Sequence, residues 1–254
     1  MKRIISFFAM AAMLSTALVS CNKDNGTPGT GNEGGELPGI TLPASLSGSE
    51  YIVVQLGAEE LEAIKSKVTV NMMPYTTDSD KDGIALYVWE GTYAGGTCSG
   101  LNSYGFTDEW VNLYVTTVGW SGAAYNLTAD GLVDRASDWA KFKAIAGNES
   151  DWYFHFAYKS EQVSSHVGQI HWAGGAYNFV FGDPAGTFTD GNEIRLTPVS
   201  GEYKTGEWNE YEVCLADTPI NFAADATSEN FFTFLSGGET GTTLDMDAIF
   251  FYKK

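Results

Sequence analysis

The sequence has few positive charges and few cysteines. Its 254 residues include 14 lysines and arginines against 32 aspartates and glutamates, which gives a formal net charge of −18, and only 3 cysteines. Such an acidic chain repels nucleic acid and anionic lipid headgroups, which argues against a protein that binds either of them; the charge favours solubility instead. The cysteines and histidines do not have the spacing of a zinc site.

Two catalytic signatures are also absent from the sequence. Retaining glycosidases of the jelly-roll kind need two carboxylates on one strand face in a Glu-x-Asp-x-x-Glu run, but Glu149 and Asp151 are followed by Phe154 where the second glutamate should be. A Gly-x-Ser-x-Gly nucleophile elbow is missing as well. The sequence therefore favours a protein that is not an enzyme, and if it is one, a polysaccharide lyase or a glycoside hydrolase.

The longest apolar run is short and lies at the amino terminus. The basic start MKR is followed by IISFFAMAAMLSTALVS, which is typical of a secretory signal. The run ends in Leu-Val-Ser-Cys at 18–21, which resembles the lipobox of bacterial lipoproteins. This resemblance implies a signal peptide over 1–20, a lipid on Cys21, and a chain anchored at the outer membrane, at the cell surface or on the periplasmic face.

The rest of the chain divides into a tether and one domain. Residues 21–48 are rich in Gly, Thr and Asn and have no apolar periodicity, so we expect a flexible tether. Residues 49–254 have the length of one sizeable domain. Once Cys21 carries a lipid, Cys98 and Cys214 remain, and they either form a disulfide or serve as two small buried apolar residues.

Residues 49–254 have the pattern of an all-β protein. Aromatic residues make up 14% of the chain, there are 29 glycines, and short β-rich runs recur between turn signals, which indicates a β-sandwich or a β-barrel. We expect two short peripheral helices, at 58–67 and at 137–147, where Ser137 is the predicted N-cap. The expected strands are 51–56, 68–73, 84–89, 110–117, 123–128, 151–159, 167–172, 176–181, 211–216, 230–235 and 244–252.

Three expected strands in the middle of the chain place polar side chains on one face. We expect 151–159 and 167–172 to pair as a hairpin that sets His155 opposite His171. A two-residue turn at Gly174 and Gly175 would then set His171 opposite Asn178. The residues of this candidate binding face are Tyr153, His155, Gln169, His171 and Asn178, and the opposite face, with Phe154, Phe156, Ile170, Trp172, Phe179 and Phe181, is expected to be core.

Three segments resemble strands of jelly-roll carbohydrate-binding modules, and this resemblance implies a jelly-roll β-sandwich. They are WYFHFAYKS at 152–160, GEWNEYEVCLADTPI at 206–220 and TTLDMDAIFFYKK at 242–254. With the lipobox, the chain is similar to surface glycan-binding lipoproteins of polysaccharide-utilisation systems, which implies non-catalytic binding of a polysaccharide or oligosaccharide beside neighbouring outer-membrane uptake proteins. Sugars stack on aromatic rings, and Trp89, Tyr93 and Trp120 are expected at strand ends or in loops, where they are free to serve as platforms.

Two alternatives stay open. Gln-Ile-His at 169–171 resembles a strand of alginate-lyase-type polysaccharide lyases, which implies that Gln169 and His171 polarise a uronate carboxylate while Tyr153 or Tyr177 moves a proton. The lyases' arginine-containing strand motif is absent, because the mature chain has only Arg135 and Arg195. The second alternative is a structural or adhesive subunit of the fimbrial type.

The run DSDKDG at 78–83 resembles the start of an EF-hand calcium loop. Asp78, Asp80, Asp82 and Gly83 fit positions 1, 3, 5 and 6, but position 12 is Trp89 rather than a bidentate carboxylate. The run is either a loop of Asx turns between two strands or a calcium loop of another kind with the three aspartates as ligands. Calcium is the only cofactor that the sequence suggests.

Overall fold

The computed structural model describes most of the region expected to fold. Its described ranges are 42–73, 84–88, 93–117, 122–127, 136–183, 193–225, 229–237 and 239–254. The predicted lipid site Cys21, the predicted platforms Trp89 and Trp120, and the predicted calcium ligands Asp78, Asp80 and Asp82 lie outside these ranges. Within them, no helix combines the length and the apolar character needed to cross a bilayer.

One sheet, sheet A, is built around the last strand of the chain. The long strand β13 pairs with β7 on one side, and on its other side with β5 along its first half and β1 along its second half. Strands β11, β2 and β4 extend the sheet outwards from β7, β1 and β5. The bounds are β1 Glu50–Gln55, β2 Val68–Asn71, β4 Tyr93–Leu101, β5 Thr107–Val115, β7 Trp152–Lys159, β11 Asn209–Cys214 and β13 Thr243–Lys253.

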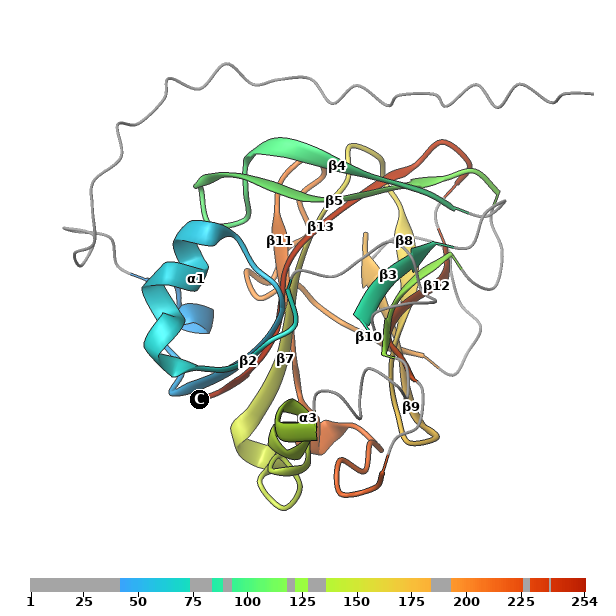
Figure 1. Ribbon diagram of the computed structural model, residues 1–254. Helices are drawn as coiled ribbons and strands as arrows, with labels where there is room; N and C mark the ends of the chain where they lie inside the picture. The colour runs from blue at the N-terminus through green and yellow to red at the C-terminus, as the bar shows by residue number, and fades with distance from the viewer. Residues whose placement is uncertain are drawn as a thin grey trace, which may run out of the picture.

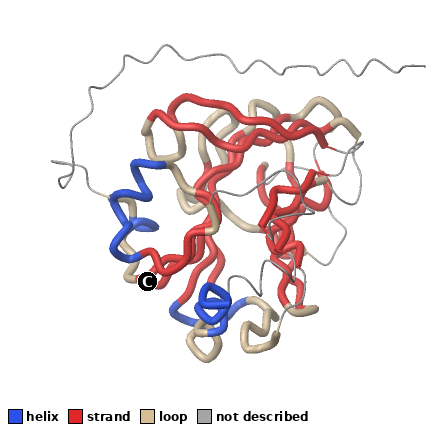
Figure 2. Tube along the Cα trace, in the orientation of Figure 1, coloured by secondary structure: helices blue, strands red, loops and turns tan. Residues whose placement is uncertain are grey.

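The other sheet, sheet B, has the strand order β10-β9-β8-β12-β6-β3 in the part of the chain that is described. Its strands are β3 Ile84–Val88, β6 Ala123–Leu127, β8 Ser165–Trp172, β9 Gly175–Gly182, β10 Ile194–Arg195 and β12 Glu229–Gly237. The chain changes sheets between β6, β7 and β8 and again between β11, β12 and β13. The two sheets face each other (Figures 1 and 2), which confirms the predicted jelly-roll β-sandwich.

Among the described residues, two short α-helices lie at the periphery, as predicted. Helix α1 (Ala58–Ile64) joins β1 to its parallel neighbour β2 and packs on the outer side of sheet A, whereas α3 (Ala136–Lys143) lies at one end of the sandwich (Figure 1). Helix α3 begins at Ala136, so Ser137 lies inside it and is not its N-cap. Short 3₁₀ turns are η1 Ala44–Leu46, η2 Lys65–Lys67, η3 Glu149–Asp151 and η4 Leu215–Asp217.

The core between the sheets is mostly aromatic. Phe156 of β7 contacts Phe179, Phe181, Tyr211 and Phe232 with ring centroids 5.1–5.7 Å apart. All six residues predicted for the core face are fully buried, and Trp152 and Tyr158 join them. Such a core forms because alternate residues of β7, β8 and β9 point to the same side of their sheet.

The outer side of sheet A carries a second apolar cluster. Tyr51 and Val53 of β1 and Phe250 and Tyr252 of β13 are fully buried there, beneath α1 and the 3₁₀ turn that holds Leu46. Because both sides of the central strands of sheet A are buried, the sequences of these strands are nearly continuous apolar runs, as in IFFY at 249–252.

Two strands, β4 and the two-residue β10, were not predicted. Strand β4 has the sequence YAGGTCSGL, in which three glycines and small polar residues hide its strand character. Cys214 is a free thiol whose Sγ lies 3.8 Å from the Glu149 carbonyl, so the disulfide between Cys98 and Cys214 that the sequence left open is not formed.

Candidate functional site

The outer surface of sheet B, here the outer B face, carries the polar side chains of Gln169, His171 and Asn178 together. Gln169 pairs with Asn178 across the β8–β9 ladder and with Thr233 of β12 on its other side. Gln169 Nε2 donates a hydrogen bond to Asn178 Oδ1 at 2.9 Å. Three of the five predicted site residues therefore share one face, as the sequence analysis predicts.

The β8–β9 turn differs in position from the prediction without changing that face. Trp172 pairs with Gly175, so the two turn residues are Ala173 and Gly174 rather than Gly174 and Gly175. Their φ angles of 48° and 79° are the positive values that a type I′ turn requires. The observed β8–β9 register differs from the predicted one by two residues, so His171 pairs with Ala176 instead of Asn178. Because side chains alternate with a period of two, every side chain stays on the predicted side of the sheet.

Tyr153 and His155 do not belong to this face, and the predicted β7–β8 hairpin is wrong. Strand β7 pairs with β11 and β13 in sheet A, whereas β8 pairs with β9 and β12 in sheet B. His155 and His171 therefore lie on different sheets. The error arises because the five-residue link between the two strands crosses from one sheet to the other, and alternation alone does not reveal such a crossing.

His155 is a buried structural residue on the outer side of sheet A. Its Nδ1 lies 2.8 Å from the carbonyl of Ala248, which a bulge in β13 presents at a φ of 52°. Its Nε2 lies 3.0 Å from Glu210 Oε2, and its ring stacks on Phe250. Burial pushes the pKa of Glu210 upwards, but the hydrogen bond and charge of His155 hold it below its usual value.

Tyr153 and Tyr177, the two tyrosines suggested as proton shuttles, both lie away from Gln169 and His171. Tyr153 is on sheet A, with Lys254 Nζ 3.7 Å from its ring centroid. Tyr177 pairs with Ile170 on the inner side of sheet B, where it is 5% exposed, and burial raises its pKa. Neither tyrosine is placed to exchange a proton with a substrate on the outer B face.

The outer B face is open at its β8–β9 end and closed around Val167, Val180 and Thr233. Gln169, His171 and Asn178 are half-buried and Ala176 is exposed, whereas Val167, Val180 and Thr233 are 2–3% exposed. The open end thus presents amide and imidazole groups beside a small methyl group. These groups donate and accept hydrogen bonds, which suits a polyhydroxylated ligand.

Sequence reasoning missed Thr233, the residue of β12 that continues this row. The signal was present in NFFTFL at 230–235, where one threonine interrupts four apolar residues. It was missed because β12 is separated from β8 by about sixty residues, and nothing in the sequence says that the two strands are neighbours. Tyr93, expected to be a free platform, is 3% exposed and belongs to the core.

The described carboxylates show no metal centre. Within the described ranges, no three Asp, Glu, His or Cys side chains are arranged to hold a metal ion. Three neighbouring acidic groups, Glu60, Asp108 and Asp247, already receive protein donors from Asn102, Ala58 and Ser103. The expected calcium loop at 78–82 lies outside the described residues, so calcium stays a prediction.

The sequence matches no family model and no curated protein. Solved structures that are similar include an exo-β-agarase, with a TM-score of 0.37 and 8% identity over 72% of this chain and 25% of that one. This chain thus spans a quarter of the agarase.

Two carbohydrate-binding modules from Clostridium thermocellum are also similar. A family 11 module in complex with a β-1,3-1,4-mixed-linked tetrasaccharide has a TM-score of 0.35 and 10% identity over 69% of this chain and 93% of the module. The C-terminal family 22 module of Xyn10B has a TM-score of 0.31 and 11% identity over 69% of this chain and 96% of the module. TM-scores this low identify neither a family nor a ligand for this chain.

Proposed function

We propose that this chain is a non-catalytic glycan-binding protein, held at the outer membrane by a lipid on Cys21, and that its outer B face binds the sugar. The observation that carries the proposal is the row Asn178, Gln169 and Thr233 across three adjacent strands, with His171 one pleat away. The partner is a polysaccharide or oligosaccharide met at the cell surface, beside outer-membrane uptake proteins.

The side chains of this row match the chemistry of sugars. An amide offers a carbonyl oxygen and an NH₂ group in one plane, so it can accept from one hydroxyl and donate to its neighbour on the same pyranose ring. Gln169 and Asn178 hold each other through one hydrogen bond, which fixes both planes before a ligand arrives. Such pre-organisation reduces the entropy lost on binding.

The predicted aromatic platforms are close in sequence to two strands of sheet B. Trp89 directly follows β3 and Trp120 comes shortly before β6, and both strands are in sheet B. In this proposal they supply the stacking surface, while Gln169, His171 and Asn178 supply the hydrogen bonds.

Calorimetric titration of the purified full chain with soluble polysaccharides tests the proposal. The panel contains mixed-linkage β-glucan, xyloglucan, xylan and alginate. We expect binding to at least one of them and a loss of about 30-fold in affinity in the double variant Gln169→Ala/Asn178→Ala, because each amide contributes about 1 kcal/mol through its hydrogen bonds.

The matched control is Thr97→Ala, an exposed residue of β4 on the other sheet, which should leave the affinity unchanged. Binding that survives the double variant would move the site away from the outer B face. No binding to any polysaccharide would favour the structural or adhesive function. Absorbance of unsaturated products near 235 nm during incubation with alginate would instead indicate a lyase.

A further inference from the structure

A buried carboxylic acid lies where α1 meets sheet A. Glu60 is 1% exposed, although the other acidic residues of the same helix, Glu59 and Glu62, are exposed. A glutamate in the interior requires a partner or a proton, since an isolated buried charge is too costly. The surroundings of its two carboxyl oxygens therefore decide which form the folded chain holds.

The two oxygens of Glu60 have different surroundings. Oε1 accepts a hydrogen bond from the amide Nδ2 of Asn102, in the β4–β5 turn. Oε2 finds no donor among the described residues. Oε2 and Asp108 Oδ2 of β5 both lie beside Gly57, where an added Cβ would collide with each of them. Asp108 Oδ2 itself accepts from the backbone N–H of Ala58 at 2.7 Å.

The other groups that face Glu60 are acidic or neutral. Asp247 of β13 is 1% exposed and accepts from Ser103 Oγ at 3.0 Å, and Tyr104 of the β4–β5 turn lies nearby. Burial, with smaller contributions from Asp247 and Asp108, raises the pKa of Glu60 to about 7. Burial also raises the pKa of Asp247 and of Tyr104, which favours their neutral forms, and neither side chain can carry a positive charge.

We propose that Glu60 and Asp108 share one proton, carried on Glu60 Oε2 and donated to Asp108 Oδ2, and that this proton fastens α1 to sheet A. The shared proton gives Oε2 the hydrogen bond that it otherwise lacks and leaves one negative charge instead of two at Gly57. When alkaline solution removes the proton to water, two carboxylates face each other there, and the start of α1 is pushed off the sheet.

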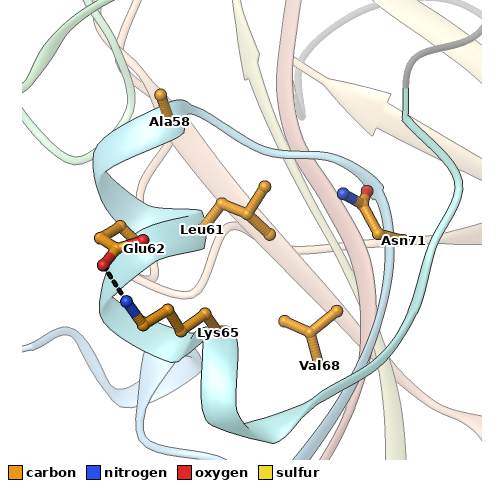
Figure 3. Close-up of a pocket in the computed structure, with 6 residues that line it drawn as sticks. All are labelled: Ala58, Leu61, Glu62, Lys65, Val68 and Asn71. Atoms are coloured by element: carbon orange, nitrogen blue, oxygen red, sulfur yellow. Dashed lines mark hydrogen bonds and ion pairs between the residues drawn. The ribbon is translucent and has the colours of Figure 1, made fainter.

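The loosening of α1 has a consequence at the surface. A hollow of about 410 Å³ lies between α1 and the edge strand β2. Figure 3 shows its lining side chains, among them the ion pair of Glu62 and Lys65. Its lining residues are Ala58, Leu61, Glu62, Lys65, Val68 and Asn71. Because α1 forms one wall, the proton on Glu60 controls the width of this hollow.

Hydrogen exchange of the full chain, followed by mass spectrometry at pH 6 and pH 8, tests the shared proton. The readout is the protection factor of the peptide that covers α1, corrected for the intrinsic pH dependence of exchange. We expect protection to fall about tenfold from pH 6 to pH 8 in the parent chain. The reason is that Glu60 releases its proton far more readily when α1 has left sheet A than when α1 is packed on it. In Glu60→Gln the protection should be the same at both pH values.

Glu59→Gln, on the exposed side of the same helix, is the matched control and should behave like the parent chain. Asp108→Asn is the second variant: its amide oxygen can still accept from Ala58, but the paired charge is gone, so the tenfold difference should shrink. A tenfold fall that persists in either Glu60→Gln or Asp108→Asn would overturn the proposal. So would protection at pH 8 that rises with calcium and falls with chelator in the triple variant Asp78→Asn/Asp80→Asn/Asp82→Asn, since the cluster around Glu60 would then hold a cation.

Discussion

Acid should destabilise this protein through His166, the fully buried histidine on the inner side of β8. Its ring lies 5.7 Å from those of Tyr158 and Phe181, its Nε2 is 3.4 Å from Ser164 Oγ, and its Nδ1 has no hydrogen-bond partner among the described residues. Burial lowers the pKa of His166 from 6.5 to about 3. The folded chain therefore holds a neutral imidazole down to about pH 3, while the unfolded chain protonates it near pH 6.5.

The direction and size of the effect follow from this difference. A histidine with a depressed folded pKa contributes its full stability above pH 6.5, and the contribution is lost as the pH falls towards 3. A pH of 5 lies about 1.5 units below the pKa of the histidine in the unfolded chain. Protonation of the unfolded chain therefore lowers the free energy of unfolding by about 2 kcal/mol relative to pH 8. For a domain of this size, that loss lowers the melting temperature by about 4–8 °C.

Urea unfolding at pH 5 and pH 8, for the parent chain and for His166→Phe, measures this contribution. Other groups titrate in the same range, and Glu60 changes the free energy of unfolding in the opposite direction. The quantity to compare is therefore the difference in free energy of unfolding between the two proteins at each pH. We expect that difference to grow by about 2 kcal/mol in favour of His166→Phe as the pH falls from 8 to 5. Tyr158→Phe, which keeps the imidazole, should not show this growth. A difference that does not change with pH would refute the buried neutral histidine.

Two further outcomes test the sequence-based expectations. If Asp78, Asp80 and Asp82 bind calcium, then calcium should raise the melting temperature, chelator should lower it, and the triple Asp→Asn variant should lose the shift; a shift that the variant keeps would place the ion elsewhere. If Cys21 carries a lipid, then cells fed labelled palmitate should label the parent chain and not Cys21→Ala, and labelling of the variant would contradict the anchor.

The sequence was sufficient to predict the strands that alternate large apolar and polar residues, because burial of one face produces that alternation. In β7, the alternation of Trp152, Phe154, Phe156 and Tyr158 marks the core face, and all four are buried. In β8 and β9 the same reasoning placed Gln169, His171 and Asn178 together, and a register error of two residues left that grouping intact because side chains repeat every two residues along a strand.

The sequence was insufficient to assign strands to sheets. The link between β7 and β8 is as short as a hairpin loop, yet it crosses the sandwich, so His155 was grouped with the wrong neighbours. Its true partners, Glu210 and the bulged Ala248, lie 55 and 93 residues further along the chain. Glu60 was hidden in the same way, because AEELEAIK has the pattern of an exposed amphipathic helix and nothing local indicates that Asp108 and Asp247 surround one of its glutamates.

Two-dimensional NMR of the isotopically labelled full chain, titrated with an oligosaccharide of the polysaccharide that binds best, tests the central claim most directly. The account predicts that the side-chain amide signals of Gln169 and Asn178 and the backbone signals of His171 and Ala176 shift together and saturate at one ligand concentration. A saturable titration that leaves these four residues unchanged while signals elsewhere shift would contradict the assignment of the outer B face as the glycan-binding site.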